Sequence, residues 1–268
     1  MNTLAVALAV VLLFFKAASP PTLGPDHAQT PVLGVSALSV AVGQPVTLSL
    51  EQPAPGGATP LEWPDSPAWF FVRLAGTQHN RSADEALTRE DRTRLIPASP
   101  GVAMIGIDLA PANESWDAER FREFTGDAAK PAAVEVHRSA TALVRVTHAD
   151  GSPAHDHTPT SKSGQQVEIR PLMDPTSLLP GSDLPVRVYV RGVGAAGARV
   201  IARHALTGER VETVADDKGI AHLRITHPGV WTIESRSLVA PRDQGQAWIA
   251  AFATLTFEAP ERREGAPK

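Results

Sequence analysis

Three histidines and two aspartates lie close together in a polar segment and are the residues best suited to chemistry. They are His148, Asp150, His155, Asp156 and His157, all within the stretch HADGSPAHDH. Neutral imidazole nitrogens bind Zn, Cu, Ni and Co, and a carboxylate oxygen can complete such a site. The spacing predicts a transition-metal site if the segment is a loop on which His155 and His157 converge. On a strand those two side chains would point to opposite faces, and the alternative is a solvated linker that contains three histidines.

A glycine motif elsewhere in the chain suggests a second kind of site. Gly192–Gly197 matches G-x-G-x-x-G, and Asp216 follows roughly 20 residues later, as in dinucleotide-binding folds. That use requires a helix to begin at the last glycines. Instead, Ala198–Arg203 alternates between apolar and polar residues, which is typical of a strand. The motif therefore predicts a hairpin loop and no nucleotide cofactor.

Other catalytic signatures are missing from the sequence. The chain has no cysteine, which excludes disulfides, thiolate metal sites and a cysteine nucleophile. It has no G-x-S-x-G elbow, H-E-x-x-H pair or P-loop. The remaining histidines, among them His204, His222 and His227, fall on or beside predicted strands, where a lone histidine is usually structural. We predict a protein that is not an enzyme, and the only cofactor suggested is a transition metal ion (Ni, Co, Zn or Cu).

The N-terminus predicts export. Leu4–Phe15 is apolar but about 12 residues long, short of the roughly 20 needed to span a bilayer, and small residues follow it. Residues 1–19 are therefore expected to form a signal peptide. A retained membrane anchor is the alternative, because Lys16 follows the apolar run and no Lys or Arg precedes it. Either way the rest of the protein would be periplasmic or extracellular, with residues 20–31 as a flexible spacer.

Short apolar segments separated by Gly and Pro predict a first β domain over residues 32–148. The expected strands are Val35–Val42, Val46–Leu50, Trp69–Leu74, Val102–Leu109 and Thr141–Thr147. One helix is expected at Glu114–Thr125, where Trp116, Phe121 and Phe124 can share a face and Ser115 or Asp117 can cap the start.

A second, more regular β domain is expected over residues 165–260, after a His- and Asp-bearing linker at 149–164 and before a charged tail at 261–268. Its strands are Val167–Pro171, Leu184–Val190, Ala198–His204, Val211–Val214, Ile220–Ile225, Trp231–Ser237 and Ile249–Phe257. About seven short strands with turn signals between them indicate a β-sandwich. The fold class is therefore all-β, with two sandwich-like domains in tandem and one short helix in the first.

Several strings of the second domain resemble one bacterial family of unknown function. They are a P-x-x-L-x-P-G turn (Pro175–Gly181), a D-x-x-G hairpin (Asp216–Gly219), P-G-x-W (Pro228–Trp231) and a closing LTFE strand (Leu255–Glu258). Some members of this nickel-transport-associated family are described as periplasmic components of cobalt or nickel uptake. The resemblance spans roughly residues 35–258. It implies an N-terminal β domain followed by a prealbumin-like or collagen-binding-B-like sandwich, and it transfers no individual ligand.

Two functions follow as expectations. The first is an exported, non-enzymatic accessory to nickel or cobalt handling, with a membrane permease or another cell-envelope protein as partner. The second is a structural or adhesion-like sandwich that binds a protein or glycan. The formal net charge of −4 and the lack of a basic stripe exclude nucleic acid as a partner. Membrane contact is expected only through an uncleaved N-terminal segment.

Overall fold

The computed structural model of the chain describes residues 30–54, 57–65, 67–82, 93–125, 132–241, 243 and 245–261. Nearly all of the elements in these ranges are β-strands, so the expected all-β class with one short helix is confirmed. No helix within these ranges is both long and apolar enough to cross a membrane. The leader predicted at residues 1–19 and most of the predicted spacer lie outside the described residues.

The strands fall into a first and a second half of the chain. The first half holds β1 (Val32–Val35), β2 (Ser39–Ala41), β3 (Val46–Ala54), β4 (Gly57–Leu61), β5 (Trp69–Leu74), β6 (Thr77–Asn80), β7 (Arg94–Leu95), β8 (Gly101–Asp108), β9 (Ala112–Trp116) and β10 (Ala132–Thr147). The second half holds β11 (Val167–Pro171), β12 (Ser182–Val190), β13 (Val193–Gly194), β14 (Arg199–His204), β15 (Arg210–Val214), β16 (Ile220–Ile225), β17 (Gly229–Val239) and β18 (Trp248–Ala259).

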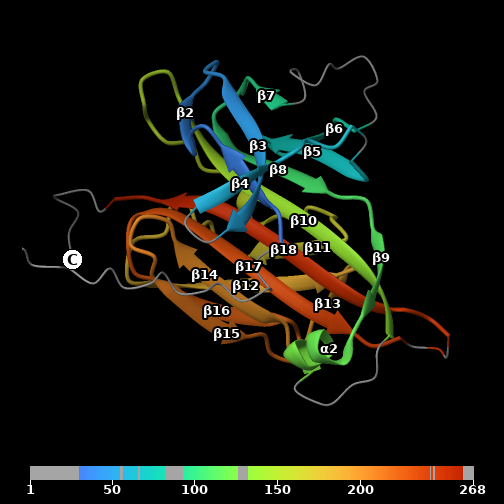
Figure 1. Cartoon of the computed structure of the whole chain (residues 1–268). Helices are drawn as coiled ribbons and strands as arrows, with labels where there is room; N and C mark the ends of the chain where they lie inside the picture. Colours follow the sequence, from blue (N-terminus) through green and yellow to red (C-terminus); the bar gives the residue numbers. More distant parts are fainter. Residues whose placement is uncertain are drawn as a thin grey trace, which may run out of the picture.

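A ten-stranded sheet joins the two halves (Figure 1). Its strand order is β15-β14-β17-β18-β10-β8-β5-β6, with β2 and β9 also paired to β10. The junction is a parallel pairing of β10 with β18 that runs from Val134 opposite Trp248 to Ala142 opposite Thr256. The domain boundaries at 149–164 stay a prediction. β10, which precedes this segment, and β18, which follows it, are hydrogen-bonded to each other in the same sheet.

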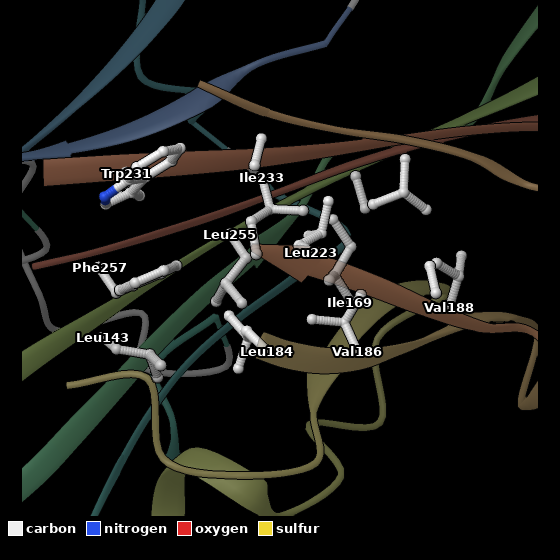
Figure 2. Close-up of a cluster of buried hydrophobic side chains, with 14 of the residues drawn as sticks. Leu143, Ile169, Leu184, Val186, Val188, Leu223, Trp231, Ile233, Leu255 and Phe257 are labelled. Carbon is white, nitrogen blue, oxygen red and sulfur yellow. The ribbon is translucent and has the colours of Figure 1, made fainter. Parts of the chain in front are cut away.

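A second sheet of β11, β12, β13 and β16 packs on one face of the large sheet and encloses the main core. We refer to this face of the large sheet as its inner face and to the opposite one as its outer face. Figure 2 shows this core, in which side chains of both sheets meet. In β16 every second residue, namely Ala221, Leu223 and Ile225, is buried, and the residues between them are exposed. This alternation follows from the two-residue period of a strand with one face on a core.

A small sheet of β1, β3 and β4, with β7 paired to β3, covers part of the outer face. Its apolar residues pack on alternate positions of β10, and a second cluster forms there. The clearest members are Leu33, Val46, Leu48, Leu50, Ala140, Ala142, Val144 and Val146. Leu143 of the same strand belongs to the main core instead. Because neighbouring residues of a strand point to opposite faces, β10 contributes to both cores.

The helix α2 (Ala118–Thr125) covers the far end of the outer face and is shorter than expected (Figure 1). The prediction of a helix from Glu114 is wrong at its start, because β9 pairs with β10 up to Trp116. The predicted cap at Asp117 is confirmed, since its carboxylate accepts from the backbone N–H of Arg120 at 2.9 Å. The expected strand Val35–Val42 is likewise divided, into β1 and β2, by a bend.

Candidate functional site

The predicted metal-binding segment is an ordered loop between β10 and the 3₁₀ turn η2 (Thr158–Thr160). Asp156 is used structurally there. Its carboxylate accepts from the backbone N–H of Thr158 at 2.8 Å and of Val102 at 3.2 Å. These bonds hold the start of η2 and fasten the loop to β8, so both carboxylate oxygens of Asp156 already have donors.

Asp150 stabilises the turn that follows β10. Its Oδ1 accepts from the backbone N–H of Ser152 at 2.9 Å and from the Ser152 hydroxyl at 2.6 Å. These hydrogen bonds lower the pKa of Asp150, and the nearby charge of His148 adds to the effect. His148 is exposed, as are the other two histidines of the segment.

The five predicted ligands are not gathered into one site. Over the described residues, no group of three or more His, Cys, Asp or Glu side chains is arranged to hold a metal ion. His155 lines a hollow of about 260 Å³ together with Asp174 and Thr176. The Arg145 guanidinium also lines it and donates to the Thr176 carbonyl. The metal site at residues 148–157 therefore stays a prediction.

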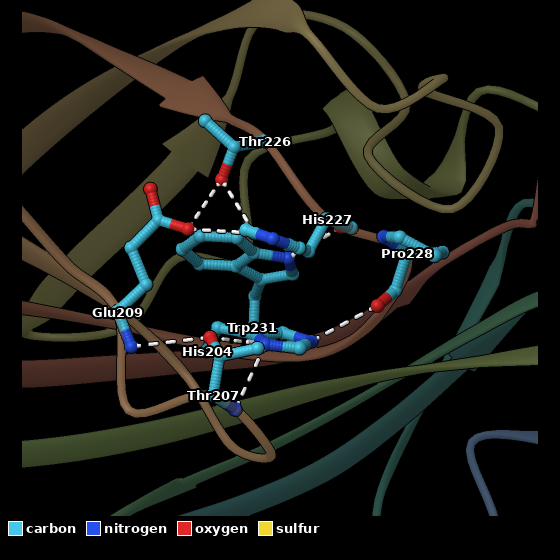
Figure 3. Close-up of polar contacts among 7 residues, drawn as sticks. All are labelled: His204, Thr207, Glu209, Thr226, His227, Pro228 and Trp231. Carbon is cyan, nitrogen blue, oxygen red and sulfur yellow. Dashed lines mark hydrogen bonds and ion pairs between the residues drawn. The ribbon is translucent and has the colours of Figure 1, made fainter.

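A polar cluster that the sequence did not reveal lies at the end of the sandwich where β14, β16 and β18 finish (Figure 3). Buried His204 is at its base, with Nε2 2.9 Å from the Pro228 carbonyl oxygen. Because a carbonyl only accepts, Nε2 carries the proton. Nδ1 then accepts from the Thr207 hydroxyl at 2.8 Å and from the Thr207 backbone N–H at 3.3 Å. His204 is thus a neutral, fully bonded structural histidine.

His227 stacks on His204, with ring centroids 5.4 Å apart and planes 19° apart. Its Nδ1 lies 2.6 Å from Oε2 of Glu209, and the Thr226 hydroxyl donates to the same oxygen at 2.6 Å. The hydrogen bond from Thr226 and the contact with His227 lower the pKa of Glu209. Trp231 closes the cluster by donating its indole N–H to the His227 carbonyl at 2.9 Å (Figure 3).

This cluster connects loops that belong to both sheets. Thr226 and His227 lie in the β16–β17 loop, and Glu209 lies in the β14–β15 turn. Loop 172–181, between β11 and β12, is attached to the same end because the Gly181 N–H donates to the Ile225 carbonyl at 2.6 Å. No local pattern predicts the Glu209–His227 contact, because both residues lie in irregular segments 18 positions apart.

Exposed apolar side chains also lie on these loops. Leu206, at the tip of the β14–β15 turn, is 91% exposed. On loop 172–181, Leu172 is 39%, Met173 43% and Leu179 43% exposed. In the sequence, part of this loop (Pro175–Gly181) was recognised only as one of the turns that resemble the family. We refer to these loops, residues 172–181, 205–209 and 226–228, as the loop end of the sandwich.

The glycine motif has the predicted hairpin role. Val190 of β12 pairs with Val193 of β13, and Arg191 and Gly192 form the turn, with φ of +50° and +77°. The Asp216–Gly219 turn is also present, with the Gly219 N–H bonded to the Asp216 carbonyl at 3.0 Å. It connects strands of different sheets and is therefore not a hairpin.

Comparisons with known proteins give a family and little else. No curated protein matches the chain. Among solved structures, murine CEACAM1b is 10% identical over 87% of this chain and all of that one, with a TM-score of 0.22. Fibronectin(III)-like modules of Clostridium thermocellum CbhA are 9% identical over 88% and 98%, with a TM-score of 0.25. TM-scores this low support no conclusion about this chain.

The family model that matches is described as a domain of unknown function, DUF4198, and it covers residues 37–237. This confirms the expected membership of a family of unknown function. The association with nickel transport and the prealbumin-like character of the second half stay predictions. With more than half of its residues matched, the chain belongs to the DUF4198 family.

Proposed function

We propose that this protein is an exported, non-enzymatic binding module that docks on a cell-envelope protein through its loop end. The observation that carries the proposal is the set of exposed apolar side chains there. Of the large hydrophobic side chains exposed among the described residues, half lie on these loops. They are Leu172, Met173, Leu179 and Leu206. Contiguous exposed apolar side chains beside polar groups are typical of protein-interaction sites.

The energetics favour a partner with an apolar contact surface. Full burial of one leucine side chain contributes about 1.5–3 kcal/mol, so several such residues can support specific binding. The cost of ordering the loops on binding is reduced, because the Thr226–Glu209 bond and the Gly181–Ile225 bond already hold them. His227 and Glu209 would form the polar rim that commonly surrounds an apolar centre.

A binding role without catalysis is consistent with the use of the polar groups in the cluster. Both nitrogens of His204 are bonded within the fold, and the carboxylate of Glu209 accepts from Thr226 and His227. Export is supported by the apolar leader at Leu4–Phe15.

Photocrosslinking in the native cell envelope tests the proposal. A photoreactive residue is placed at Leu179 or Leu206, with a matched control at exposed Asp217 in the β15–β16 turn at the opposite end. Both loop-end positions should crosslink to the same envelope protein, and Asp217 should not. The double substitution Leu179→Ser and Leu206→Ser should abolish the adduct formed from Met173. Equal adducts at Asp217, or none at Leu179 and Leu206, would contradict the proposal.

A second candidate function is nickel or cobalt handling at the predicted loop. It is supported by the family resemblance and by the proximity of His148 to Asp150. The test is calorimetry of the purified protein with Ni, Co, Zn and Cu salts. Binding near one ion per chain with about micromolar affinity, lost in the double variant His155→Ala and His157→Ala, would support it. No heat with any of the four ions would remove it, and the crosslinking result would be unaffected.

A further inference from the structure

Two adjoining hollows lie between the small outer sheet and the outer face of the large sheet. They have volumes of about 320 and 430 Å³ and share the lining residues Val32, Glu51 and Thr232. One wall is formed by β1 and β3, and the floor by β14, β17 and β18. We refer to the two hollows together as the groove, and each has the size of a small-ligand site.

The groove carries charged groups of both signs. Glu234 of β17 is only 6% exposed, and its Oε1 accepts from Arg236 Nε at 2.7 Å and from the Thr30 hydroxyl at 2.9 Å. Arg203 lines the same hollow, where burial lowers its pKa and the charge of Glu234 opposes that shift. Glu51 stands where the two hollows meet and accepts from the Ser49 hydroxyl at 2.8 Å.

This arrangement disfavours a charged ligand. A small anion would lie against Glu51 and Glu234, and a cation would lie against Arg203. A ligand charge that loses water without a matched partner carries a large desolvation cost. An uncharged ligand avoids this cost and can still hydrogen-bond to both carboxylate and guanidinium groups.

Hydroxyl groups are the feature that such a ligand needs. A carboxylate accepts two hydroxyl donors, a guanidinium donates to two neighbouring oxygens, and a hydroxyl can do either. The groove adds protein hydroxyls that retain acceptor capacity, since the Thr254 hydroxyl donates to the Pro31 carbonyl at 2.7 Å and keeps its lone pairs. Val32, Pro53 and Ala58 supply apolar contacts for C–H groups.

We infer that the groove binds a short, neutral, polyhydroxylated chain, an uncharged oligosaccharide, with Glu51 and Arg203 as its principal hydrogen-bonding groups. An extended peptide added to the outer edge of β1 is the competing occupant. That edge is short, because β1 has four residues and Pro31 before it lacks an N–H and has its carbonyl bonded to Thr254. The oligosaccharide therefore fits the groove better.

The test is an amide-resolved NMR titration of the mature protein with maltotriose, cellotriose, mannotriose and chitotriose. One of these sugars should shift the amides of Val32 and Thr232 with a millimolar Kd. The variants Glu51→Gln and Arg203→Gln should each weaken that Kd about tenfold, or about 1.4 kcal/mol. The matched control Arg224→Gln, on the exposed face of β16, should bind within about twofold of the wild type.

Three outcomes would overturn the inference. They are no shift of these amides by any of the sugars, a Kd unchanged in Glu51→Gln, and stronger binding of glutamate, spermidine or an extended peptide at the same amides. Thermal unfolding of each variant separates loss of binding from loss of folding. Ala205 of the loop end lines one of the hollows, but Glu51 lies on β3, outside the loop end. The Glu51→Gln variant should therefore keep the crosslinks formed from Leu206.

Discussion

Gln165 donates a hydrogen bond from Nε2 to Oδ1 of Asp108 at 3.1 Å, and both side chains are buried. The same Nε2 lies 3.1 Å from the Ile107 carbonyl, and the amide oxygen accepts from the Thr141 hydroxyl at 2.6 Å. Gln165 precedes β11, while its partners belong to β8 and β10. One side chain thus connects the start of the second half of the chain to the first half.

Replacing Gln165 with alanine should lower the free energy of unfolding by about 2–3 kcal/mol, because it removes the Nε2 donor shared by the buried Ile107 carbonyl and the Asp108 carboxylate of β8. The measurement is urea unfolding at neutral pH. Gln166→Ala is a matched control, since the Gln166 side chain is exposed and its bond to Asp108, 3.0 Å long, comes from the backbone N–H. Equal losses in the two variants would contradict the role of the Gln165 amide.

The pH dependence of stability should reveal buried Glu168. Burial raises its pKa above the ordinary 4.5, although the backbone N–H groups of Ser163 (2.7 Å) and Gly164 partly oppose the shift. The folded state therefore holds the proton more tightly than the unfolded state. This stabilisation is present below about pH 4.5 and is lost as pH rises through the folded pKa.

Glu168→Gln removes that dependence. The stability of the variant relative to the wild type should become more favourable between about pH 4 and 7, measured by urea unfolding in steps of pH. Asp216→Asn is a control of opposite sign. The N–H groups of Ile220 and Lys218 lower the pKa of Asp216, so the wild type gains stability from it as pH rises. A flat difference for Glu168→Gln would refute the prediction.

The main core and the loop end should respond differently to the same substitution. Leu184 is fully buried between the sheets, as Figure 2 shows, and Leu184→Ala should cost about 2–5 kcal/mol through lost burial and a cavity. Leu206→Ala, at a side chain that is 91% exposed, should change stability by less than about 0.5 kcal/mol. Chemical denaturation measures both. A large loss in Leu206→Ala would show that this residue serves the fold and would weaken its proposed docking role.

Two glycines of the G-x-G-x-x-G string should differ in their tolerance of alanine. A Cβ on Gly194 would lie 2.4 Å from the Lys218 carbonyl oxygen, so the backbone must move, and Gly194→Ala should cost about 3 kcal/mol. Gly197 has φ of +73° with nothing within 4 Å of an added Cβ, and Gly197→Ala should cost about 1–2 kcal/mol. Thermal unfolding ranks the variants, and the reverse order would exclude the close approach at Gly194.

The local pattern of the sequence predicted every strand of the second half except the two-residue strand β13. β11 and β16 begin and end at the predicted residues, and β17 and β18 extend the predicted ranges by one or two residues at each end. These strands have one face on a core and the other face on solvent or a partner layer. Apolar and polar residues therefore alternate in β16, whereas β11 and β18 are largely buried on both faces and consist mainly of apolar residues.

The first half depended more on distant contacts. The sequence predicted a strand at Thr141–Thr147, but β10 begins at Ala132. Residues 132–136 are held by β9, and residues 134–142 by β18, which lies more than 100 positions further along the chain. The pairing of β9 with β10 also places Glu114–Trp116 in a strand, where a helix was expected. Tertiary pairing here overrode the local helical spacing of the aromatic residues.

The sequence alone determined that this is an all-β chain without cysteine, with its second half built from short strands separated by turns. Only the tertiary structure decided that β10 and β18 join the halves in one sheet, that Glu209 meets His227, and that Glu51 faces the same groove as Arg203. The physical reason is that alternation specifies which side of a strand is buried. It does not specify the neighbouring strand, which is selected by the packing of residues far apart in the chain.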